Sequence, residues 1–327
     1  MPVSPPKNFT ASEEDRQKVI LATSSYDHDI KLWQAHTGLC ERTLQHSESQ
    51  VNALEITPDC QLLAAAGHQH IRMYDLNSST SDHIINYDGI SKNVTALGFQ
   101  ENGKWMYTGG EDGTAKIWDL RSKNLHISKI FKVDTPVNCV CLHPNQVDMF
   151  VGDQAGVIHI WDVNSTNNEN DPLVPDVNAS IQHLAVDAKG MFLAAITNKG
   201  KVYIWRLKGG TEENPITLTP IRSLAAHAKY GLKVKFSPDS SLMATTSADT
   251  KCTIWRTKDF SKVIDLTDQN QRWVWDVTFS SDSKFVVTGS SDSTARLWSI
   301  SSGKVVREYS GHRKAISALA FRDTPLY

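Results

Sequence analysis

The 327-residue sequence lacks an excess of charge of either sign and lacks any long apolar run. It has 34 Lys and Arg residues against 36 Asp and Glu residues, for a formal net charge of -2. Nucleic acids and anionic membranes attract proteins with a basic excess, so we expect this chain to bind neither directly. No apolar stretch approaches the roughly 18 residues that a membrane span needs. Residues 1–18 have no apolar segment of the signal-peptide kind, and we expect a disordered tail there.

The sequence also has few cysteines and none of the common catalytic signatures. Its five cysteines include no C-x-x-C pair, and Cys139 and Cys141 alternate as on one face of a strand, so buried reduced thiols are the simplest interpretation. Neither a P-loop, nor H-E-x-x-H, nor G-x-S-x-G, nor a dinucleotide-binding glycine motif occurs. His68 and His70 are near neighbours without further ligands at metal spacing. We therefore expect no enzymatic activity, no metal, no cofactor and no small-molecule substrate.

What the sequence does contain is a strong internal repeat. The segment FSPDSSLMATTSADTKCTIWRT, which begins at Phe236, matches FSSDSKFVVTGSSDSTARLWSI, which begins at Phe279, so the two copies lie 43 residues apart. The intervals between successive equivalent aromatic residues are 41, 44, 43, 44, 50 and 43 residues, which is the period of a WD40 unit. The equivalent positions are Trp33, Tyr74, Trp118, Trp161, Trp205, Trp255 and Trp298.

Within each unit the pattern is that of four short strands separated by turns. Alternating runs end in Pro-Asp or Asn-Gly turns, and the third strand ends in an aromatic residue that is often followed by Asp. One four-stranded sheet cannot bury both of its faces, so the sheets must stack radially. The sequence therefore predicts an all-β fold, a seven-bladed WD40 β-propeller over residues 19–323.

The two ends of the chain predict how the ring closes. The first unit begins at Val19 with the second strand of a blade, and GHRKAISALAF near the C-terminus has the pattern of a first strand with nothing after it. We expect residues 315–321 to pair beside residues 19–24. Without that pairing two sheet edges would stay exposed, which favours aggregation.

A recurring set of polar residues supports the same closure. In many WD blades a His before the first strand bonds an Asp in a later turn, and a Ser or Thr and the blade's Trp extend the network. One expected set lies within a single unit, and the other forms only if the termini meet. We interpret both as structural, because two copies at equivalent positions argue against a hydrolase triad. The sets are His227, Ser247, Asp249 and Trp255, and His312, Ser25, Asp27 and Trp33.

The repeat register also locates the face where propellers usually bind partners, around the mouth of the central channel. Two positions of each repeat lie there, four and six residues before the recurring apolar residue that ends the first strand, such as Phe279. Most residues at these positions are small or polar, and the partner-binding candidates among them are Gln50, Asn52, Asn93 and Asn138. Two repeats differ, because they place Trp273, Trp275 and Tyr230 there. Exposed Trp and Tyr dominate binding hot spots, so we predict that these three residues contact a partner. The alternative is that Trp275 fills the channel wall or packs under the neighbouring blade.

A second candidate site is the short W-D-x-R ending formed by Trp118, Asp119 and Arg121. It is similar to the box by which some WD proteins dock onto cullin-RING ubiquitin ligases, which makes a substrate receptor the alternative function. A turn in which Arg121 forms a salt bridge is the simpler interpretation of so short a motif.

Longer segments carry a closer resemblance. YDHDIKLWQAHTGLC, AAAGHQHIRMYDLNS and GKWMYTGGEDGTAKIWDLRS resemble the G-protein-β-subunit-like family, also called lethal-with-sec-thirteen protein eight. The likeness runs from Val19 to Asp323 and includes one irregular repeat, in which His68 and Tyr74 stand where others have Asp and Trp. A G-protein β subunit proper is disfavoured, since residues 1–18 show no coiled-coil heptads.

The resemblance implies a non-catalytic subunit of both target-of-rapamycin (TOR) kinase complexes. Such a subunit binds the kinase domain beside its active-site cleft, stabilises it and supports nutrient and growth signalling with the other complex subunits. It further implies a cytoplasmic protein that reaches the lysosomal surface as part of the complex. The assignment of the kinase contact to Trp273, Trp275 and Tyr230 is our own inference.

Overall fold

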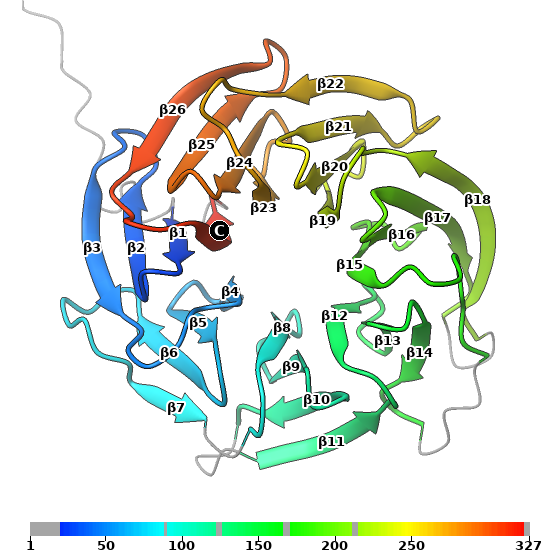
Figure 1. Cartoon of the computed structure of the whole chain (residues 1–327). Helices are drawn as coiled ribbons and strands as arrows, with labels where there is room; N and C mark the ends of the chain where they lie inside the picture. Colours follow the sequence, from blue (N-terminus) through cyan, green and yellow to red (C-terminus); the bar gives the residue numbers. More distant parts are fainter. Residues whose placement is uncertain (1–19, 88–89, 122–125, 166–170, 211–214, 324–327) are drawn as a thin grey trace, which may run out of the picture.

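Seven antiparallel sheets stand around a central channel (Figure 1). The computed structural model describes residues 20–87, 90–121, 126–165, 171–210 and 215–323, and every regular element in these ranges is a strand. None of these ranges contains a helix of the length and apolarity that a membrane crossing requires. The predicted seven-bladed propeller is confirmed, whereas the predicted tail, residues 1–18, lies outside the described residues.

Each blade is written here from its innermost strand, at the channel, to its outermost strand. Blade 1 consists of β27 (Ile316–Arg322), β1 (Ile20–Ser25), β2 (Asp29–Gln34) and β3 (Cys40–Gln45). Blade 2 consists of β4 (Ala53–Ile56), β5 (Leu62–Ala66), β6 (Ile71–Asp75) and β7 (Ile85–Tyr87). Blade 3 consists of β8 (Val94–Phe99), β9 (Trp105–Gly110), β10 (Thr114–Asp119) and β11 (His126–Lys132). Blade 4 has three described strands, β12 (Val137–Leu142), β13 (Asp148–Asp153) and β14 (Ile158–Asp162).

The remaining three blades have four strands each. Blade 5 consists of β15 (Ile181–Val186), β16 (Phe192–Thr197), β17 (Lys201–Lys208) and β18 (Thr217–Ala225). Blade 6 consists of β19 (Gly231–Phe236), β20 (Leu242–Ser247), β21 (Cys252–Arg256) and β22 (Lys262–Leu266). Blade 7 consists of β23 (Val274–Phe279), β24 (Phe285–Ser290), β25 (Thr294–Ser299) and β26 (Lys304–Ser310).

Strands from the two ends of the chain close the ring, as expected. β27 pairs antiparallel with β1, with Ala320 opposite Ala22 and Arg322 opposite Ile20. This pairing supplies blade 1 with the inner strand that the first repeat lacks. The predicted closure is therefore confirmed, with the pairing beginning at Ile316 rather than at Ala315.

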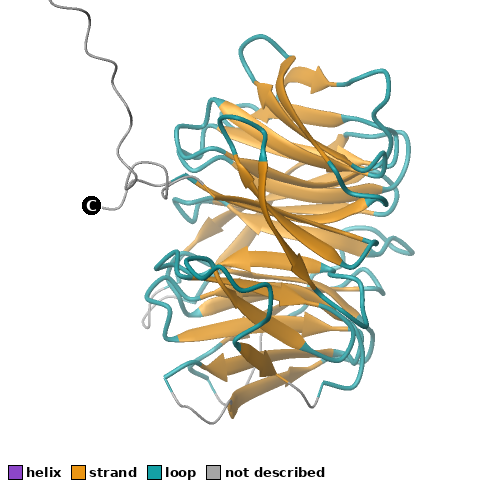
Figure 2. Ribbon diagram, turned by 90° about the vertical axis from the view of Figure 1, so that its left-hand side faces the viewer, coloured by secondary structure: helices purple, strands orange, loops and turns teal. Residues whose placement is uncertain are grey.

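The core lies between the blades. One buried cluster joins Ala22, Ile30 and Leu44 of blade 1 to Leu54 and Tyr74 of blade 2, and similar clusters fill the other seams. Because both faces of each sheet are covered, the middle strands are apolar or small almost throughout. Figure 2 shows the ring from the side, with the loops gathered on its two faces and the strands between them.

Close approach of neighbouring blades requires glycine at the seams. A Cβ atom added to Gly109 in blade 3 would lie 2.7 Å from Val140 Cγ2 and 2.8 Å from Val137 Cγ1 of blade 4. Gly289 of blade 7 meets Ile316 Cγ2 of blade 1 in the same way, at 2.7 Å. Any side chain at either position would push two blades apart.

Candidate functional site

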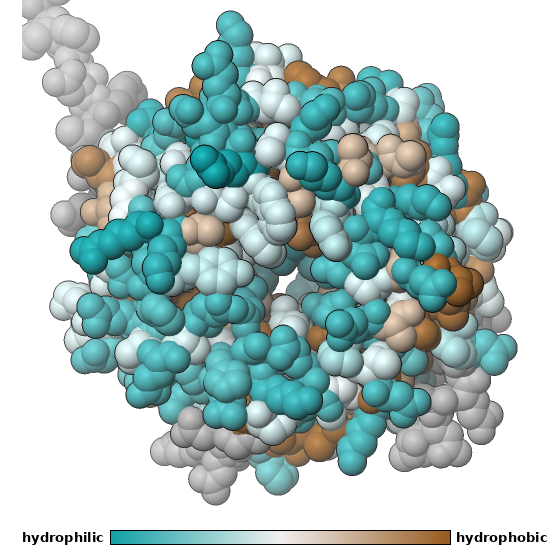
Figure 3. Space-filling model, in the orientation of Figure 1, coloured by the Kyte–Doolittle hydropathy of each residue, from teal (hydrophilic) through white to brown (hydrophobic). Residues whose placement is uncertain are grey.

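Two kinds of loop form one face of the ring, which we call the channel-mouth face. One kind leads into the innermost strand of a blade, and the other joins the second strand to the third. Backbone hydrogen bonds join the two kinds, from Ser291 N to Trp273 O at 2.9 Å and from Ala248 N to Tyr230 O at 2.9 Å. Around the central opening the space-filling view shows a largely hydrophilic surface (Figure 3).

Two of the three predicted aromatic anchors are well exposed on this face. Tyr230 before β19 is 56% exposed and Trp273 before β23 is 42% exposed, and they belong to neighbouring blades 6 and 7. Large apolar side chains that remain in water in the free chain are available to a partner. Their position at the channel mouth agrees with the register-based assignment, and their contact with a partner stays a prediction.

Trp275 lies one step deeper, within β23, and is half-buried. Its ring centroid is 5.7 Å from that of Trp273 and 6.3 Å from that of Tyr26, in a tilted and an edge-on arrangement. We call Tyr26, Trp273 and Trp275 the aromatic cluster. The Trp275 indole nitrogen is buried and has no hydrogen-bond partner in the described part of the chain.

Tyr26 was missed by the sequence reasoning. It lies in the turn between β1 and β2 of blade 1, and its backbone N–H donates to Ala315 O at 3.0 Å. Its turn lies between the second and third strands, whereas the register of the repeats places only residues just before and within the innermost strands at the channel mouth. Burial raises the pKa of the Tyr26 phenol, which keeps it neutral beside Trp275.

Polar residues at the repeat position that Trp275 holds in blade 7 join successive blades around the channel. Each donates a side-chain hydrogen bond to a backbone carbonyl of the next blade, and we call these bonds the inter-blade hydrogen bonds. Because the donors are used within the ring, these residues have a structural task in the free chain. The bonds run from Ser317 Oγ to Val51 O (2.6 Å), Asn52 Nδ2 to Val94 O (3.1 Å), Thr95 Oγ1 to Val137 O (2.7 Å) and Asn138 Nδ2 to Ile181 O (2.8 Å).

The predicted polar contacts of the channel mouth are therefore of two kinds. The amide nitrogens of Asn52 and Asn138 already serve the inter-blade hydrogen bonds, a role that the sequence reasoning did not assign. Gln50 donates to Asn52 Oδ1 at 3.1 Å, and Asn93 donates to Glu111 Oε2 at 3.1 Å, so both bond to groups on the same face. Partner contact by any of these four residues stays a prediction.

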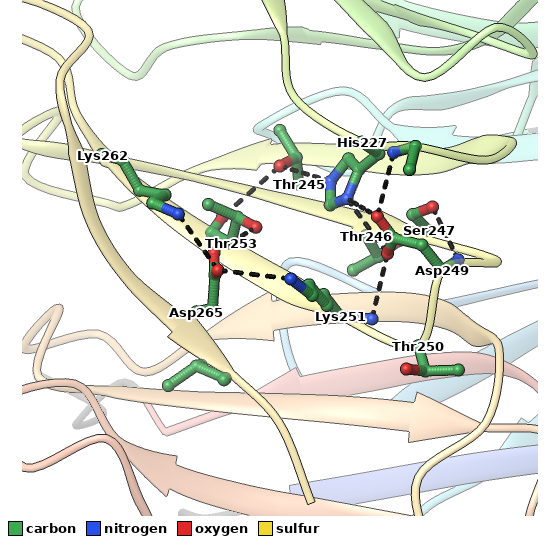
Figure 4. Close-up of polar contacts among 12 residues, drawn as sticks. His227, Thr245, Thr246, Ser247, Asp249, Thr250, Lys251, Thr253, Lys262 and Asp265 are labelled. Carbon is green, nitrogen blue, oxygen red and sulfur yellow. Dashed lines mark hydrogen bonds and ion pairs between the residues drawn. The ribbon is translucent and has the colours of Figure 1, made fainter.

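The buried polar network of blade 6 has the predicted histidine and aspartate but a different hydroxyl (Figure 4), and the predicted tryptophan bonds to that hydroxyl. Trp255 Nε1 donates to Thr245 Oγ1 at 2.9 Å, and the same oxygen lies 2.9 Å from His227 Nε2. His227 Nδ1 lies 3.0 Å from Asp249 Oδ2. The assignment of Ser247 was wrong, because its hydroxyl sits at the end of β20 and accepts from Asp249 N.

Blade 1 repeats this network across the chain termini. Trp33 Nε1 donates to Thr23 Oγ1 at 2.8 Å, Thr23 Oγ1 lies 2.7 Å from His312 Nε2, and His312 Nδ1 lies 3.1 Å from Asp27. Ser25 was again the wrong hydroxyl, since it donates to the Lys314 carbonyl and accepts from Asp27 N.

The histidines of both networks are closed off from solvent. The side chains of His227 and His312 have no exposed surface, so neither can act as a base toward a substrate. Burial opposes ionisation of Asp249, yet hydrogen bonds from His227 and backbone N–H groups hold its pKa below the usual value. These features describe a structural network rather than a hydrolase triad.

Comparisons with known proteins agree with this architecture. A family model for the nucleolar protein 10-like N-terminal domain, a β-propeller, matches residues 13–199, which is more than half of the chain. A model for the anaphase-promoting complex subunit 4 WD40 domain matches residues 234–324. The chain is thus placed among β-propeller domains along nearly its whole length.

Individual relatives give a narrower assignment. The chain is 51% identical to the mouse protein named target of rapamycin complex subunit LST8, over 98% of this chain and 99% of that one. It is 52% identical to the Drosophila melanogaster LST8 homolog over 94% of this chain and 98% of the relative. The chain belongs to the LST8 family. With the Saccharomyces cerevisiae subunit LST8 the identity is 45%, over 93% of this chain and 99% of the relative.

In this LST8-family chain the W-D-x-R ending is a closed turn. Arg121 Nε and Nη2 donate to the two oxygens of Asp119 at 2.9 and 2.7 Å. That pairing holds the pKa of Asp119 at about 2. The motif is thus accounted for by a bidentate ion pair within the turn.

The irregular second repeat has its own form of the buried network. Tyr74 replaces the Trp of the other blades, and its hydroxyl lies 3.1 Å from His46 Nδ1. His46 Nε2 in turn lies 3.0 Å from His70 Nε2. Burial, together with the nearby charges of His70 and Arg72, lowers the pKa of His46 to about 3. Two imidazoles in contact thus replace the His–Asp pair in blade 2 of this LST8-family protein.

Proposed function

We propose that this protein is a non-catalytic subunit of the TOR serine/threonine kinase complexes, one and two, that binds and stabilises the kinase domain. The observation that carries the proposal is near-full-length identity of 51% to a mouse protein and 45% to a yeast protein, each named as a TOR complex subunit. We further propose that the protein works in the cytoplasm and reaches the lysosomal membrane surface as part of such a complex.

The channel-mouth face is the surface that we propose for the kinase. Its exposed Tyr230 and Trp273 lie over blades 6 and 7, and Trp275 supports Trp273 from below. Burial of one large aromatic side chain at an interface contributes about 2 kcal/mol or more to binding. The histidines paired with Asp249 and Asp27 are closed to solvent. These observations favour a binding role over a catalytic one.

The direct test is to purify the protein from cells and identify what accompanies it by mass spectrometry. We expect a very large kinase and the other TOR-complex subunits. Recovery of a cullin adaptor instead of the kinase would contradict the proposal. Fluorescence imaging of the same tagged protein tests the location, with part of the signal expected on lysosomes only when the kinase is present.

The surface is tested with Trp273→Ala. Removing the indole should increase the rate of dissociation from the kinase about 10-fold or more, while the thermal unfolding temperature stays that of the parent protein. Ile221→Ala is the matched control, because Ile221 is 41% exposed on the outer strand β18, away from the channel. Loss of folding in Trp273→Ala would show that Trp273 belongs to the core. An equal effect of Ile221→Ala on dissociation would show that the aromatic surface is not the contact.

A further inference from the structure

The channel-mouth face also carries a group of cations over the same blades as the exposed aromatics. Lys229 directly precedes Tyr230, Arg272 directly precedes Trp273, and Lys314 holds the equivalent repeat position in blade 1. Arg313 is its neighbour, and all four side chains are exposed. We call Lys229, Arg272, Arg313 and Lys314 the cationic arc.

The cationic arc is not neutralised by the chain itself. Within the described ranges none of its four members forms an ion pair, whereas nearby lysines do. Lys199 and Lys201 share Asp176, and Lys251 lies 3.7 Å from Asp265. Four unpaired cations at the mouth of a channel therefore attract negative charge.

The opposite half of the channel-mouth face has a different character. The repeat position of Lys229 is held by Ser49, Thr135 and Ala179 in blades 2, 4 and 5, and only blade 3 has a cation there, Lys92. Exposed or half-exposed acids lie close to these positions instead, namely Glu48, Glu111 and Asp134. Half-exposed acids lie over blades 6, 7 and 1 as well, but Asp249 and Asp27 are bonded to His227 and His312, and Asp292 is paired with Arg296. Unpaired cations therefore stand beside the aromatics over blades 6, 7 and 1, whereas blades 2 to 4 carry acids and the single cation Lys92 at the same level.

We propose that the aromatic cluster, Tyr230 and the cationic arc together bind an acidic segment of the kinase domain. An apolar side chain of that segment packs on Trp273 and Tyr230, and its Asp and Glu carboxylates lie against Lys229, Arg272 and Lys314. The inference rests on the proposed function and adds the chemistry of the partner. Charge complementarity identifies the partner, because carboxylates match the cationic half and are repelled by the acidic half.

The unpaired indole N–H of Trp275 agrees with a partner rich in hydrogen-bond acceptors. The ring of Trp275 packs against Trp273, which is exposed, and no described residue accepts the hydrogen of its indole nitrogen. A buried unpaired donor costs about 1–3 kcal/mol. If the exposed Trp273 side chain repacks on binding, an acceptor of the bound segment can pair with this nitrogen and recover that free energy.

Exposed charges act chiefly on the rate of encounter. Solvent screens them in the final complex, but they steer an oppositely charged partner toward the surface, and salt weakens that steering. The aromatic side chains, which are desolvated in the complex, act on its lifetime instead. The proposal therefore predicts that charge and aromatic variants change different rate constants.

The test uses the full chain and the purified TOR kinase, with association and dissociation rates measured at low and at physiological salt. In the variant Lys229→Glu/Arg272→Glu/Lys314→Glu we expect association to slow about 10-fold or more at low salt, with dissociation changed much less. The control, Lys104→Glu/Lys189→Glu/Lys208→Glu, reverses three exposed charges at the opposite face and should associate as the parent does. Arg272→Glu alone should give a smaller slowing in the same direction.

The outcomes separate this inference from the proposed function. If the parent protein binds the kinase and the triple variant associates at the parent rate with the same salt dependence, the acidic-segment inference is overturned while the proposed function stands. If the parent does not bind the kinase, the proposed function fails first. The inference would also be overturned if the cationic arc retains RNA or anionic vesicles at physiological salt while its charge reversal leaves the association with the kinase unchanged.

Discussion

At the scale of single residues, the Thr245 hydroxyl links Trp255 to His227. His227 Nδ1 faces the Asp249 carboxylate and must donate to it, so in the neutral ring Nε2 accepts the Thr245 hydrogen. Thr245→Val leaves the Trp255 N–H buried without an acceptor. We expect a loss of about 1–3 kcal/mol in the free energy of unfolding, measured by urea denaturation.

Two further variants make that prediction specific. Thr245→Ser keeps the hydroxyl and should lose much less stability than Thr245→Val. Ser247→Ala removes only the acceptor for one turn N–H and should cost about 1 kcal/mol or less. A larger loss from Ser247→Ala than from Thr245→Val would restore the sequence-based assignment.

The error at this position has a simple physical origin. Thr245 and Ser247 lie two residues apart on β20, so they point to the same face of the sheet and a periodic pattern cannot separate them. The pairing of β20 with β21 decides which of the two hydroxyls lies next to the indole of Trp255, and the sequence pattern does not specify that pairing. One regularity in the sequence identifies the threonine. In four blades the indole donates to a Thr that stands ten residues before it, at Trp33, Trp118, Trp255 and Trp298.

His46 makes stability sensitive to acid. In the native state its pKa is about 3, whereas an unfolded His titrates near 6.5. The unfolded state therefore binds a proton first as the pH falls below 6.5, and the native state loses stability from there down to about pH 3. The full contribution of neutral His46 is present only above pH 6.5.

The measurement is the free energy of unfolding from pH 7.5 to pH 4.5 for the parent and for His46→Gln. The variant should be less stable at neutral pH. Its free energy of unfolding should, however, fall less steeply with decreasing pH, by up to about 1.4 kcal/mol per pH unit. His183 and His312, whose pKa values are also lowered by burial, remain in both proteins and provide the common background. Parallel pH profiles would contradict the assignment to His46.

At the scale of strands, the pairing of β27 with β1 carries the closure. A chain that ends after Gly311 lacks β27, so β1 and the inner faces of blades 7 and 2 lose their partner. We expect this variant to aggregate or to elute from gel filtration as larger species, because open sheet edges pair between molecules. A chain that ends after Asp323 keeps all of β27 and should behave as the parent does.

The strand pattern was largely predictable, and the contacts between blades were not. The spacing of Trp255 and Trp298 fixes the repeat, and a missing first strand at one end with a spare one at the other implies the closure. Asn52 and Asn138 were assigned to partner binding because polar residues suit a channel mouth. Their recurrence at one register position was the available sign of inter-blade hydrogen bonds, but a repeat alignment does not show which blade a side chain reaches.

At the scale of the whole molecule, the inter-blade hydrogen bonds join four of the seven seams. Asn138→Leu removes the donor to Ile181 O and should lower the free energy of unfolding by about 1 kcal/mol. Gln182→Leu is the control, since the Gln182 amide bonds Ser180 in its own loop, and it should change stability by less than about 0.5 kcal/mol. Weaker kinase binding by Asn138→Leu at unchanged stability would assign Asn138 to the interface instead.

The pairing of β27 with β1 also has a consequence for the time course of synthesis. About 290 residues separate the two strands, and ribosomes add about 5–20 residues per second. The first strand to emerge therefore waits about 15–60 s for its partner, and during that time one of its edges has no strand beside it. A chain whose synthesis stops between β26 and β27 has blades 2 to 7 complete and a blade 1 that cannot close.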